Sequence, residues 1–490
     1  MYNIDWNKYL SCERDRNPES KVGHRHEAND PDMRNEFDSD FGRVIFSTAA
    51  RRMHDKTQVF PLTSGDYVHT RLTHSLEVMN IAVSLGSSLC RNDEFKKVYG
   101  IEGAYELEQK ICAILKTAAF VHDIGNPPYG HYGEATIRKY FKNMNWDDYI
   151  EEFGVKEVKF VKDHILDFTE FDGNTEGFRI LTRGQYLGDI NGLNLTFASL
   201  GAYLKYPNNG PVEDNGYIGR HKHGIFATEE VVFNKVVDAC HMRKEDGKVK
   251  RHPLSFLVEA ADTICYTAMD LEDGISIGKI SIDSICKWVD NYVNENGDKS
   301  AFHEYMMQGD KFSLRALLHL RDNPYKKKFE VNFRVMLISY FVKLALNNFI
   351  QYLEDIDKGS YNEELLLDDP LHIAEALGKY AREDLFVDSS IVSAELAGRS
   401  VIAGLLDIVL EKVLVKDPKK DVRIYHMLSD SGLKLVHHEC GLYDPKTGEF
   451  KMNIVELPLY YRLRLVVDWI SGMTDKYAVE TYQKLSGIRL

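Results

Sequence analysis

The sequence predicts an all-α globular fold. Apolar residues recur at helical spacing through most of the 490 residues, and runs with the two-residue period of a strand are scarce. Hydrophobic residues make up 44% and charged residues 28% of the chain, which is ordinary for a globular protein and argues against long disorder. A minor β-hairpin, within residues 210–225 or 440–453, is the only strand structure that we expect.

Helical periodicity sets the order of the expected elements. The polar residues 1–40 predict an N-terminal arm with short helices, residues 41–280 a helical core, and residues 281–490 a helical region packed on that core. Within the core, helices are expected over residues 41–59, 75–89, 105–122, 157–170, 177–182, 195–204, 228–241 and 253–271. Beyond it they are expected over residues 282–293, 312–321, 329–353, 373–380, 389–415 and 454–485.

Charge and cysteine content exclude several classes of protein. A formal charge of −14 repels nucleic acids and phosphorylated ligands at long range, so an anion site needs a local concentration of Lys, Arg or metal. The seven cysteines are scattered and form no CxxC pair, which argues against a disulfide framework or a zinc knuckle. The N-terminus has no signal-peptide pattern, and charges interrupt the apolar runs, so we expect a cytoplasmic protein without membrane contact.

One stretch, KTAAFVHDIGNPPYGHYGEATI over residues 116–137, carries the strongest signal for a site. An apolar helix ends at His122 and Asp123, a Gly-Asn-Pro-Pro turn follows, and His131 and Glu134 stand three residues apart at the next helix start. Imidazole and carboxylate groups beside a turn at a helix end form a site more readily than a core. The alternative for His131 is a surface histidine paired with an i+3 glutamate.

A candidate metal set is spread over three predicted helices. His74, His122, Asp123 and Asp262 together offer two imidazole nitrogens and two carboxylate groups. Imidazole favours transition metals, whereas carboxylates bind the whole divalent series. These residues alone do not fix the identity of the metal; our expectation is Mn²⁺ or Mg²⁺ first, with Fe²⁺, Co²⁺ and Zn²⁺ as alternatives. A His-Asp pair alone is common by chance, so the surrounding sequence has to support it.

The surrounding sequence resembles the HD-domain phosphohydrolase superfamily and, within it, the deoxynucleoside triphosphate triphosphohydrolases of the bacterial dGTPase type. The resemblance extends from about residue 40 to residue 485 and includes HTRLTHSLEV, AAFVHDIGNPPYGHYGEATI, EAADTICYTAMDLEDG and DWISGMTDKYAVETYQKL. It implies an HD-domain helical fold, with residues 41–280 as the phosphohydrolase core. It also implies metal ligation by His74, His122, Asp123 and Asp262.

The resemblance further implies that His131 and Glu134 are catalytic, with the carboxylate holding the tautomer of the imidazole. Whether His131 acts as an acid or as a base stays open. Other positions match residues that contact the substrate in the family, and each contacts either the sugar, the α-phosphate or the outer phosphates. They are Gln58, Arg71, Tyr266 and Asp270 for the deoxyribose and α-phosphate, and Asn174, Lys205, Tyr206 and Lys222 for the β- and γ-phosphates. Periodicity alone would equally allow Tyr266 to be a core aromatic.

The resulting expectation is a metal-dependent enzyme that hydrolyses deoxynucleoside triphosphates, dGTP foremost, to a deoxynucleoside and inorganic tripolyphosphate, and so controls dNTP pools. The alternatives are another HD-type nucleotide phosphohydrolase or phosphodiesterase, and a sensor that binds dNTP or single-stranded DNA. The resemblance also implies a homo-oligomer, a hexamer in this family, and regulation by a dNTP effector or single-stranded DNA.

Overall fold

The computed structural model describes residues 4–15, 34–58, 69–93, 95–96, 101–184, 191–213, 216–296, 326–415, 422–444, 447, 449–450 and 456–488. The all-α prediction is confirmed. The strands found in this part of the chain are β1 (Tyr443–Asp444) and β2 (Glu449–Phe450), which pair antiparallel within the predicted range 440–453. In the other candidate range, the described residues form turns and a short 3-10 helix (Ile218–Arg220).

The helices fall into two groups along the chain. The first group is α1 (Glu36–Ile45), α2 (Thr48–Arg52), α3 (Arg71–Arg91), α5 (Ile101–Val121), α6 (His131–Lys142), α7 (Ile150–Phe153), α8 (Val155–Asp163), α9 (Leu166–Thr169), α10 (Gly173–Arg179), α11 (Phe197–Tyr203) and α12 (Glu230–Ala239). The second is α13 (Pro253–Ser276), α14 (Ile282–Asn296), α17 (Lys326–Gln351), α18 (Leu353–Lys358), α19 (Ile373–Tyr380), α20 (Ser389–Val413), α21 (Asp430–Glu439), α22 (Leu459–Ser471) and α23 (Asp475–Leu485). Shorter 3-10 and π turns are η1 (Trp6–Lys8), η2 (Met53–Asp55), η3 (Trp146–Tyr149), η4 (Ile180–Gly184), η6 (Ala227–Glu229), η7 (Ala381–Leu385) and η8 (Val422–Met427).

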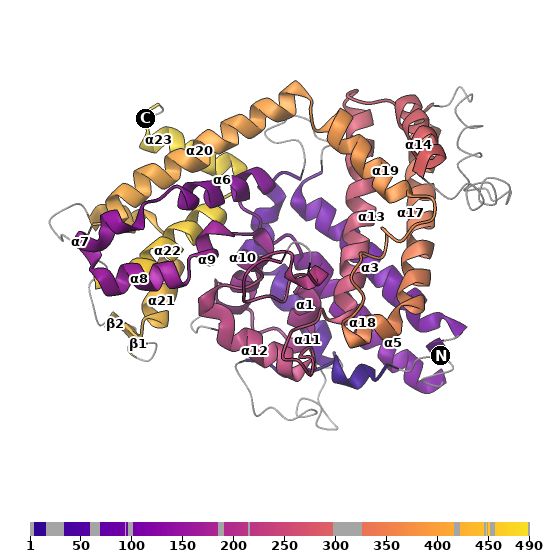
Figure 1. The fold of residues 1–490 in the computed structure, drawn as a ribbon, viewed down its shortest axis with the longest axis horizontal. Helices are drawn as coiled ribbons and strands as arrows, with labels where there is room; N and C mark the ends of the chain where they lie inside the picture. The colour runs from indigo at the N-terminus through magenta and orange to yellow at the C-terminus, as the bar shows by residue number, and fades with distance from the viewer. Residues whose placement is uncertain are drawn as a thin grey trace.

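Three hydrophobic clusters organise these helices (Figure 1). The first lies between α3, α5, α13, α14, α17 and α19, and the second between α6, α8, α20, α21 and α22. The third involves α1, α2, α11 and α12. The end of α5 and the turn after it contribute to all three: Ala119 belongs to the first cluster, Tyr129 to the second and Ile124 to the third. This turn, which was the strongest signal in the sequence, therefore lies where the clusters meet.

The N-terminal segment is anchored in the first cluster. Trp6 and Tyr9 are almost fully buried there, and Arg14 forms a buried ion pair with Asp40 at 2.6 Å. Residues from all three predicted segments share this cluster, and the divisions at residues 40 and 280 stay predictions. The rest of the predicted N-terminal arm, residues 16–33, lies outside the described residues.

Some predicted helices are interrupted. The single helix expected over residues 41–59 is wrong: α1 ends at Ile45, and Ser47 starts α2 by accepting a hydrogen bond from the backbone N–H of Ala50. The helix expected over residues 454–485 is divided into α22 and α23 because Thr474 caps a new helix. A serine or threonine cap is a local signal that apolar spacing does not report. The helix expected over residues 312–321 lies outside the described residues.

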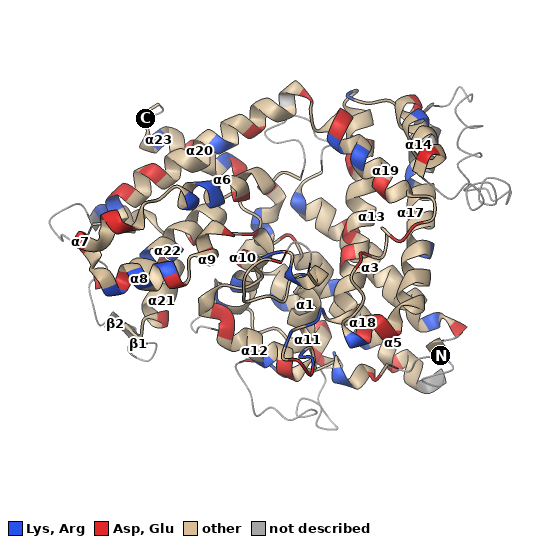
Figure 2. Ribbon diagram, viewed as in Figure 1, with Lys and Arg blue, Asp and Glu red and all other residues tan. Residues whose placement is uncertain are grey.

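The segment Phe333–Gln351 of α17 is long and apolar enough to span a bilayer by composition. Its buried side chains, among them Phe341, Ala345 and Phe349, belong to the first hydrophobic cluster. These residues form one buried face of the helix, and 39% of the segment is buried. Figure 2 shows that acidic and basic residues are interspersed along the helices of both ends of the molecule, so the negative net charge is not gathered in one element.

Candidate active site

The four predicted metal ligands converge from three helices. His74 projects from the first turns of α3, His122 and Asp123 follow the last residue of α5, and Asp262 lies in the middle of α13. His74 Nε2 is 2.9 Å and His122 Nε2 is 3.4 Å from Asp262 Oδ1, and His122 Nε2 is 3.6 Å from Asp123 Oδ2. Ligand atoms of His74, His122 and Asp123 all lie within 4.8 Å of one another. Such spacing allows one ion to be shared.

Hydrogen bonding prepares His122 for a cation. Its Nδ1 lies 2.7 Å from the carbonyl oxygen of Ala119, so Nδ1 donates there and Nε2 is the ring atom that faces Asp123 and Asp262. The Nε2 atom is buried and makes no hydrogen bond within the described chain. Burial opposes a charged imidazole, but the carboxylates of Asp123 and Asp262 outweigh it and raise the pKa of His122 to about 9. The cluster therefore attracts positive charge, and its donor set fits a divalent metal ion.

Asp123 is held from two sides. Arg71 Nη1 lies 2.5 Å from Asp123 Oδ2, and the side-chain amide of Asn126 donates to Oδ1. Burial raises the pKa of Asp123, but Arg71 and the neighbouring histidines lower it to about 2. Gly130, beside this pair, has φ 54° and ψ −126°, a conformation that only glycine adopts readily, and a Cβ atom there would approach the end of the Arg71 guanidinium. Asp123 is thus a carboxylate at neutral pH and is oriented in advance.

His131 and Glu134 form the predicted pair at the start of α6. His131 Nδ1 is 3.0 Å from Glu134 Oε2, while Glu134 Oε1 accepts the backbone N–H of Gly173 at 2.8 Å. The Glu134 side chain is only 2% exposed, whereas that of His131 is 81% exposed and borders a cavity. The hydrogen bond to Glu134 raises the pKa of His131. The free Nε2 is therefore available to a ligand in the cavity.

This cavity has a volume of about 530 Å³ and contains most of the predicted site residues. His74 and Glu134 are the two that do not line it, because they stand behind Asp262 and His131. The predicted residues that do line it are Gln58, Arg71, His122, Asp123, His131, Asn174, Lys205, Tyr206, Lys222, Asp262, Tyr266 and Asp270. Side chains separated by more than two hundred positions in the chain thus share one space.

Cationic groups gather around Tyr206, which lines this cavity. Lys205 Nζ, Lys222 Nζ and Arg251 Cζ lie 5.6, 5.5 and 5.6 Å from the centre of its ring. Both lysines are already paired with carboxylates, Lys205 with Glu259 and Lys222 with Asp172. Asn174 also binds Asp172, through its side-chain amide at 2.7 Å.

The α13 face behaves as its spacing predicts. Asp262, Tyr266 and Asp270 all line the cavity, and Tyr266 is 38% exposed, so it is not a core aromatic. Asp270 is buried; its burial, together with the charges of Asp273 and Asp262, raises its pKa well above the ordinary value. A protonated Asp270 can donate a hydrogen bond as well as accept one.

Several cavity residues were not predicted. Tyr129 and Tyr132 flank the turn and the start of α6, and Phe386, Ile391 and Glu395 come from the end of η7 and from α20. The Glu395 carboxylate interacts with the Tyr132 hydroxyl. Nothing in the sequence of this segment connects it with the metal cluster, because the contact depends on α20 packing over α6.

Comparisons with known proteins agree with this geometry. Residues 71–167 match the HD domain model, and residues 449–484 match the model of the phosphohydrolase-associated domain. A deoxyguanosinetriphosphate triphosphohydrolase-like protein of Listeria innocua is 32% identical over 99% of this chain and 100% of its own length.

Two further relatives are similar over nearly the whole chain. A deoxyguanosinetriphosphate triphosphohydrolase-like protein of Pseudomonas aeruginosa is 31% identical, over 99% of both chains. A deoxyguanosinetriphosphate triphosphohydrolase of Cronobacter sakazakii is 30% identical, over 92% of this chain and 94% of its own. The chain therefore belongs to the HD-domain deoxynucleoside triphosphate triphosphohydrolase family, the bacterial dGTPase-like hydrolases.

Proposed function

We propose that this protein hydrolyses deoxynucleoside triphosphates, dGTP foremost, to a deoxynucleoside and inorganic tripolyphosphate. The observation that carries the proposal is the convergence of His74, His122, Asp123 and Asp262 beside the His131–Glu134 pair, on one cavity of about 530 Å³. The names of the relatives support a deoxynucleotide substrate. We assign the four converging residues to a divalent ion, Mn²⁺ or Mg²⁺ foremost.

The reaction breaks the bond between the α-phosphorus and the 5′ oxygen. Water adds its oxygen to the α-phosphorus, and one of its protons ends on the 5′ oxygen of the released deoxynucleoside. A bound divalent ion supplies Lewis-acid stabilisation of the charge on a phosphoryl oxygen. His131, whose Nδ1 is engaged by Glu134, has Nε2 free to move a proton between the cavity and the reacting oxygen.

The cationic groups account for binding of a polyphosphate by an acidic protein. Arg71 offers a guanidinium beside the metal cluster, and Lys205 and Lys222 offer ammonium groups around Tyr206. A tetra-anionic ligand would draw both lysines from their carboxylate partners, Glu259 and Asp172. Asn174, next to the Lys222–Asp172 pair, would contact the same outer phosphates.

Recognition of deoxyribose is assigned to the face of α13 and to Gln58. Tyr266 would pack on the sugar at C2′, which leaves no space for a 2′-hydroxyl. Asp270, whose pKa is raised by burial, would hydrogen-bond the 3′-hydroxyl together with the amide of Gln58. Burial of Gln58 Oε1 without a partner in the described chain supports a role for this amide toward a ligand.

The preference for dGTP is assigned to the side of the cavity that α20 contributes. Phe386 and Ile391 offer an apolar surface for a base, and the Glu395 carboxylate offers acceptors for N–H groups. Guanine presents two such groups next to each other, N1–H and the 2-amino group, which match a carboxylate. A site that pairs with a substrate N–H discriminates strongly against an analogue that lacks it.

Incubation with each dNTP, alone and mixed, in the presence of Mn²⁺ or Mg²⁺ tests the proposal. Chromatography should show deoxynucleoside and tripolyphosphate; orthophosphate or pyrophosphate as the product would favour another HD-type nucleotide phosphohydrolase or phosphodiesterase. Tight binding of dNTP or single-stranded DNA without any product would favour a sensor. The cytoplasmic location, the hexamer and the dNTP or DNA effector stay predictions.

A further inference from the structure

One carboxylate attaches the turn between the metal cluster and His131 to a distant part of the chain. Asp475, the first residue of α23, is 2% exposed, and its two oxygens accept the backbone N–H groups of Thr57 and Tyr129, each at 3.0 Å. Thr57 and Tyr129 both line the active cavity, on segments that carry Gln58 and His131. Asp475 therefore joins two walls of the cavity without lining it.

A buried lysine makes a second attachment between the same regions. Lys56, 3% exposed, donates from Nζ to the carbonyl oxygens of Asn126 at 2.5 Å and Ser471 at 2.9 Å. The side chain of Asn126 in turn donates to the metal-cluster residue Asp123. Residues 449–484, which match the phosphohydrolase-associated model, thus reach the active site at two points.

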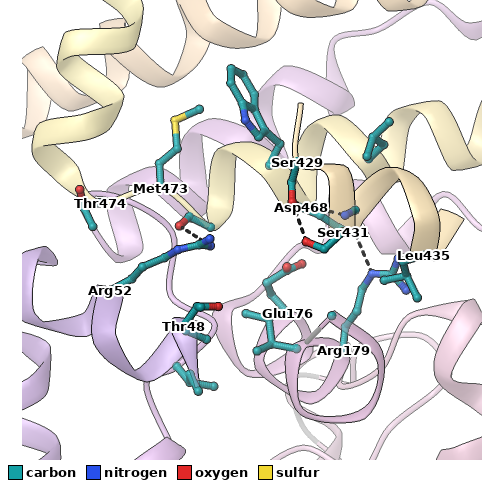
Figure 3. A pocket seen from close by; sticks show the side chains of 18 of the residues that line it. Thr48, Arg52, Glu176, Arg179, Ser429, Ser431, Leu435, Asp468, Met473 and Thr474 are labelled. Carbon is teal, nitrogen blue, oxygen red and sulfur yellow. Dashed lines mark hydrogen bonds and ion pairs between the residues drawn. The ribbon is translucent and has the colours of Figure 1, made fainter. Parts of the chain in front are cut away.

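The C-terminal stretch is held from its other side as well. A second cavity, of about 520 Å³, is lined by Lys56, Arg52 and residues of α22 and α23. Figure 3 shows Arg52 extending from α2 toward the stretch that carries Met473 and Thr474, and its Nη1 donates to the carbonyl oxygen of Gly472 at 3.1 Å. The residues before Asp475 are therefore fixed to the body of the protein, so the carboxylate is a firm anchor.

The anchored turn has a backbone conformation that needs support. Tyr129 and Gly130 have φ values of 63° and 54°, in the left-handed region, which is unfavourable for a non-glycine residue such as Tyr129. Their carbonyl oxygens accept the N–H groups of Tyr132 and Glu134, at 3.2 and 3.1 Å, and so begin α6. The position of this turn consequently determines where His131 stands.

We propose that Asp475 is a positioning residue, which sets the distance between the Gln58 wall of the cavity and the His131–Glu134 pair. The inference rests on the proposed function, because the distance matters for aligning His131 with the reacting oxygen. Hydrogen bonds to a buried carboxylate are stronger than those to a neutral acceptor, so Asp475 restrains the backbone at Thr57 and Tyr129 more firmly than a neutral side chain would. Small misplacements of a catalytic group can cost a hundredfold in rate.

The test compares Asp475→Asn with a matched control, Asp430→Asn. Asp430 is the first residue of α21, as Asp475 is of α23, and each follows a Ser or Thr cap, but the Asp430 side chain is 77% exposed and pairs with Lys434. Both substitutions remove one negative charge from a helix start. Only Asp475→Asn replaces an oxygen that accepts from the backbone N–H of Thr57 or Tyr129. The amide NH₂ group that takes its place cannot accept a hydrogen bond.

Asp475→Asn should lower kcat for dGTP by roughly 10- to 100-fold, with KM changed less than about threefold. Manganese content should stay at the wild-type level. Hydrogen–deuterium exchange should accelerate in the peptides that contain Thr57 and Tyr129. Asp430→Asn should match the wild type in all four measurements, and Asp475→Glu, which keeps two acceptor oxygens, should recover part of kcat.

Wild-type kcat in Asp475→Asn would overturn the inference. Loss of bound manganese, or a rise in KM without a fall in kcat, would also overturn it, because these results would indicate a defect in folding or in substrate binding. Equal losses in Asp475→Asn and Asp475→Glu would also overturn it. Failure of the wild type to release tripolyphosphate from dGTP would instead contradict the proposed function, and the inference with it.

Discussion

His74 and Asp262 are 188 positions apart in the chain, yet His74 Nε2 lies 2.9 Å from Asp262 Oδ1. Two long helices, α3 and α13, hold them there through the first hydrophobic cluster. His122 and Asp123 complete the group from the end of α5. A charge cluster of this kind is costly to bury without a counter-ion, which is why its strongest tests concern the metal.

Asp123→Ala should abolish the metal content measured by elemental analysis after gel filtration in metal-free buffer. The substitution removes one of the two carboxylates, and a metal site is rarely retained after loss of a charged ligand. Asp270→Asn is the control, because Asp270 lines the same cavity outside the ligand cluster. Stoichiometric metal in Asp123→Ala would contradict the ligand assignment.

His131→Ala should bind metal and dGTP normally but lose turnover by roughly 10²- to 10⁴-fold, since it removes the proton carrier and leaves the ligand cluster intact. Binding is measured by calorimetry with a non-hydrolysable dGTP analogue, and turnover by release of tripolyphosphate. His164→Ala is the control, because this histidine does not line the cavity and its Nδ1 lies 2.9 Å from the carbonyl oxygen of Phe160. Unchanged turnover would remove His131 from the mechanism.

Glu134→Gln should shift one limb of the kcat–pH profile to lower pH. The hydrogen bond to Glu134 raises the pKa of His131, so loss of the carboxylate lowers that pKa. If the alkaline limb moves, His131 acts in its protonated form as an acid; if the acidic limb moves, it acts as a base. Glu170→Gln, at a carboxylate paired with Lys142, is the control, and a profile that moves upward or not at all would refute the role of Glu134.

Glu395→Gln should lower kcat/KM for dGTP by roughly 10- to 100-fold more than for dTTP, because the amide cannot accept both N–H groups of guanine. A competition assay with mixed dNTPs measures the ratio directly. Glu411→Gln, on the same helix but paired with Lys412 at the surface, should leave the ratio unchanged. An unchanged ratio in Glu395→Gln would place base selection elsewhere.

Acid should destabilise the fold through His252. This buried residue caps α13 and lies 2.9 Å from the carbonyl oxygen of Tyr9, and burial lowers its pKa from 6.5 to about 4. Between about pH 6.5 and about pH 4, the imidazole of His252 is protonated in the unfolded chain but neutral in the folded chain. The free energy of unfolding therefore falls by up to about 3 kcal/mol over this range as the pH drops.

Urea unfolding between pH 7 and pH 4 measures this contribution. The His252→Gln variant should lack it, whereas His54→Gln, at a histidine whose side chain is 63% exposed, should retain it. A profile of His252→Gln parallel to that of the wild type would show that other groups cause the acid sensitivity.

Part of the site could be predicted from residues that are close together in the sequence, whereas the rest depends on packing between distant helices. His122, Asp123, His131 and Glu134 stand within thirteen positions at a helix end and a turn, so their proximity follows from local structure. Asp262 required the family resemblance, because nothing in α13 alone points toward α3. The partners of Lys205 and Lys222, Glu259 and Asp172, were not foreseen, since no local pattern couples them.

Two residues that the sequence analysis did not predict, Glu395 and Asp475, reach the site through the packing of α20 and α23. Glu395 reaches the cavity because α20 packs over α6, where a Cβ atom at Gly398 would collide with the ring of Tyr129. Asp475 reaches the turn because Gly472 and the cap at Thr474 redirect the chain between α22 and α23. Apolar periodicity locates each helix in the sequence but contains no information about its neighbours in space.

The hydrogen bond between Tyr129 and Asp475 also has a consequence for synthesis of the chain. The ribosome adds Asp475 346 residues after Tyr129, the turn residue that Asp475 holds. A nascent chain exposes the ligand histidines and aspartates long before the turn beside them can be fixed. On the proposed function, a fragment that ends before α23 would therefore turn over deoxynucleotides at least as slowly as the Asp475→Asn variant.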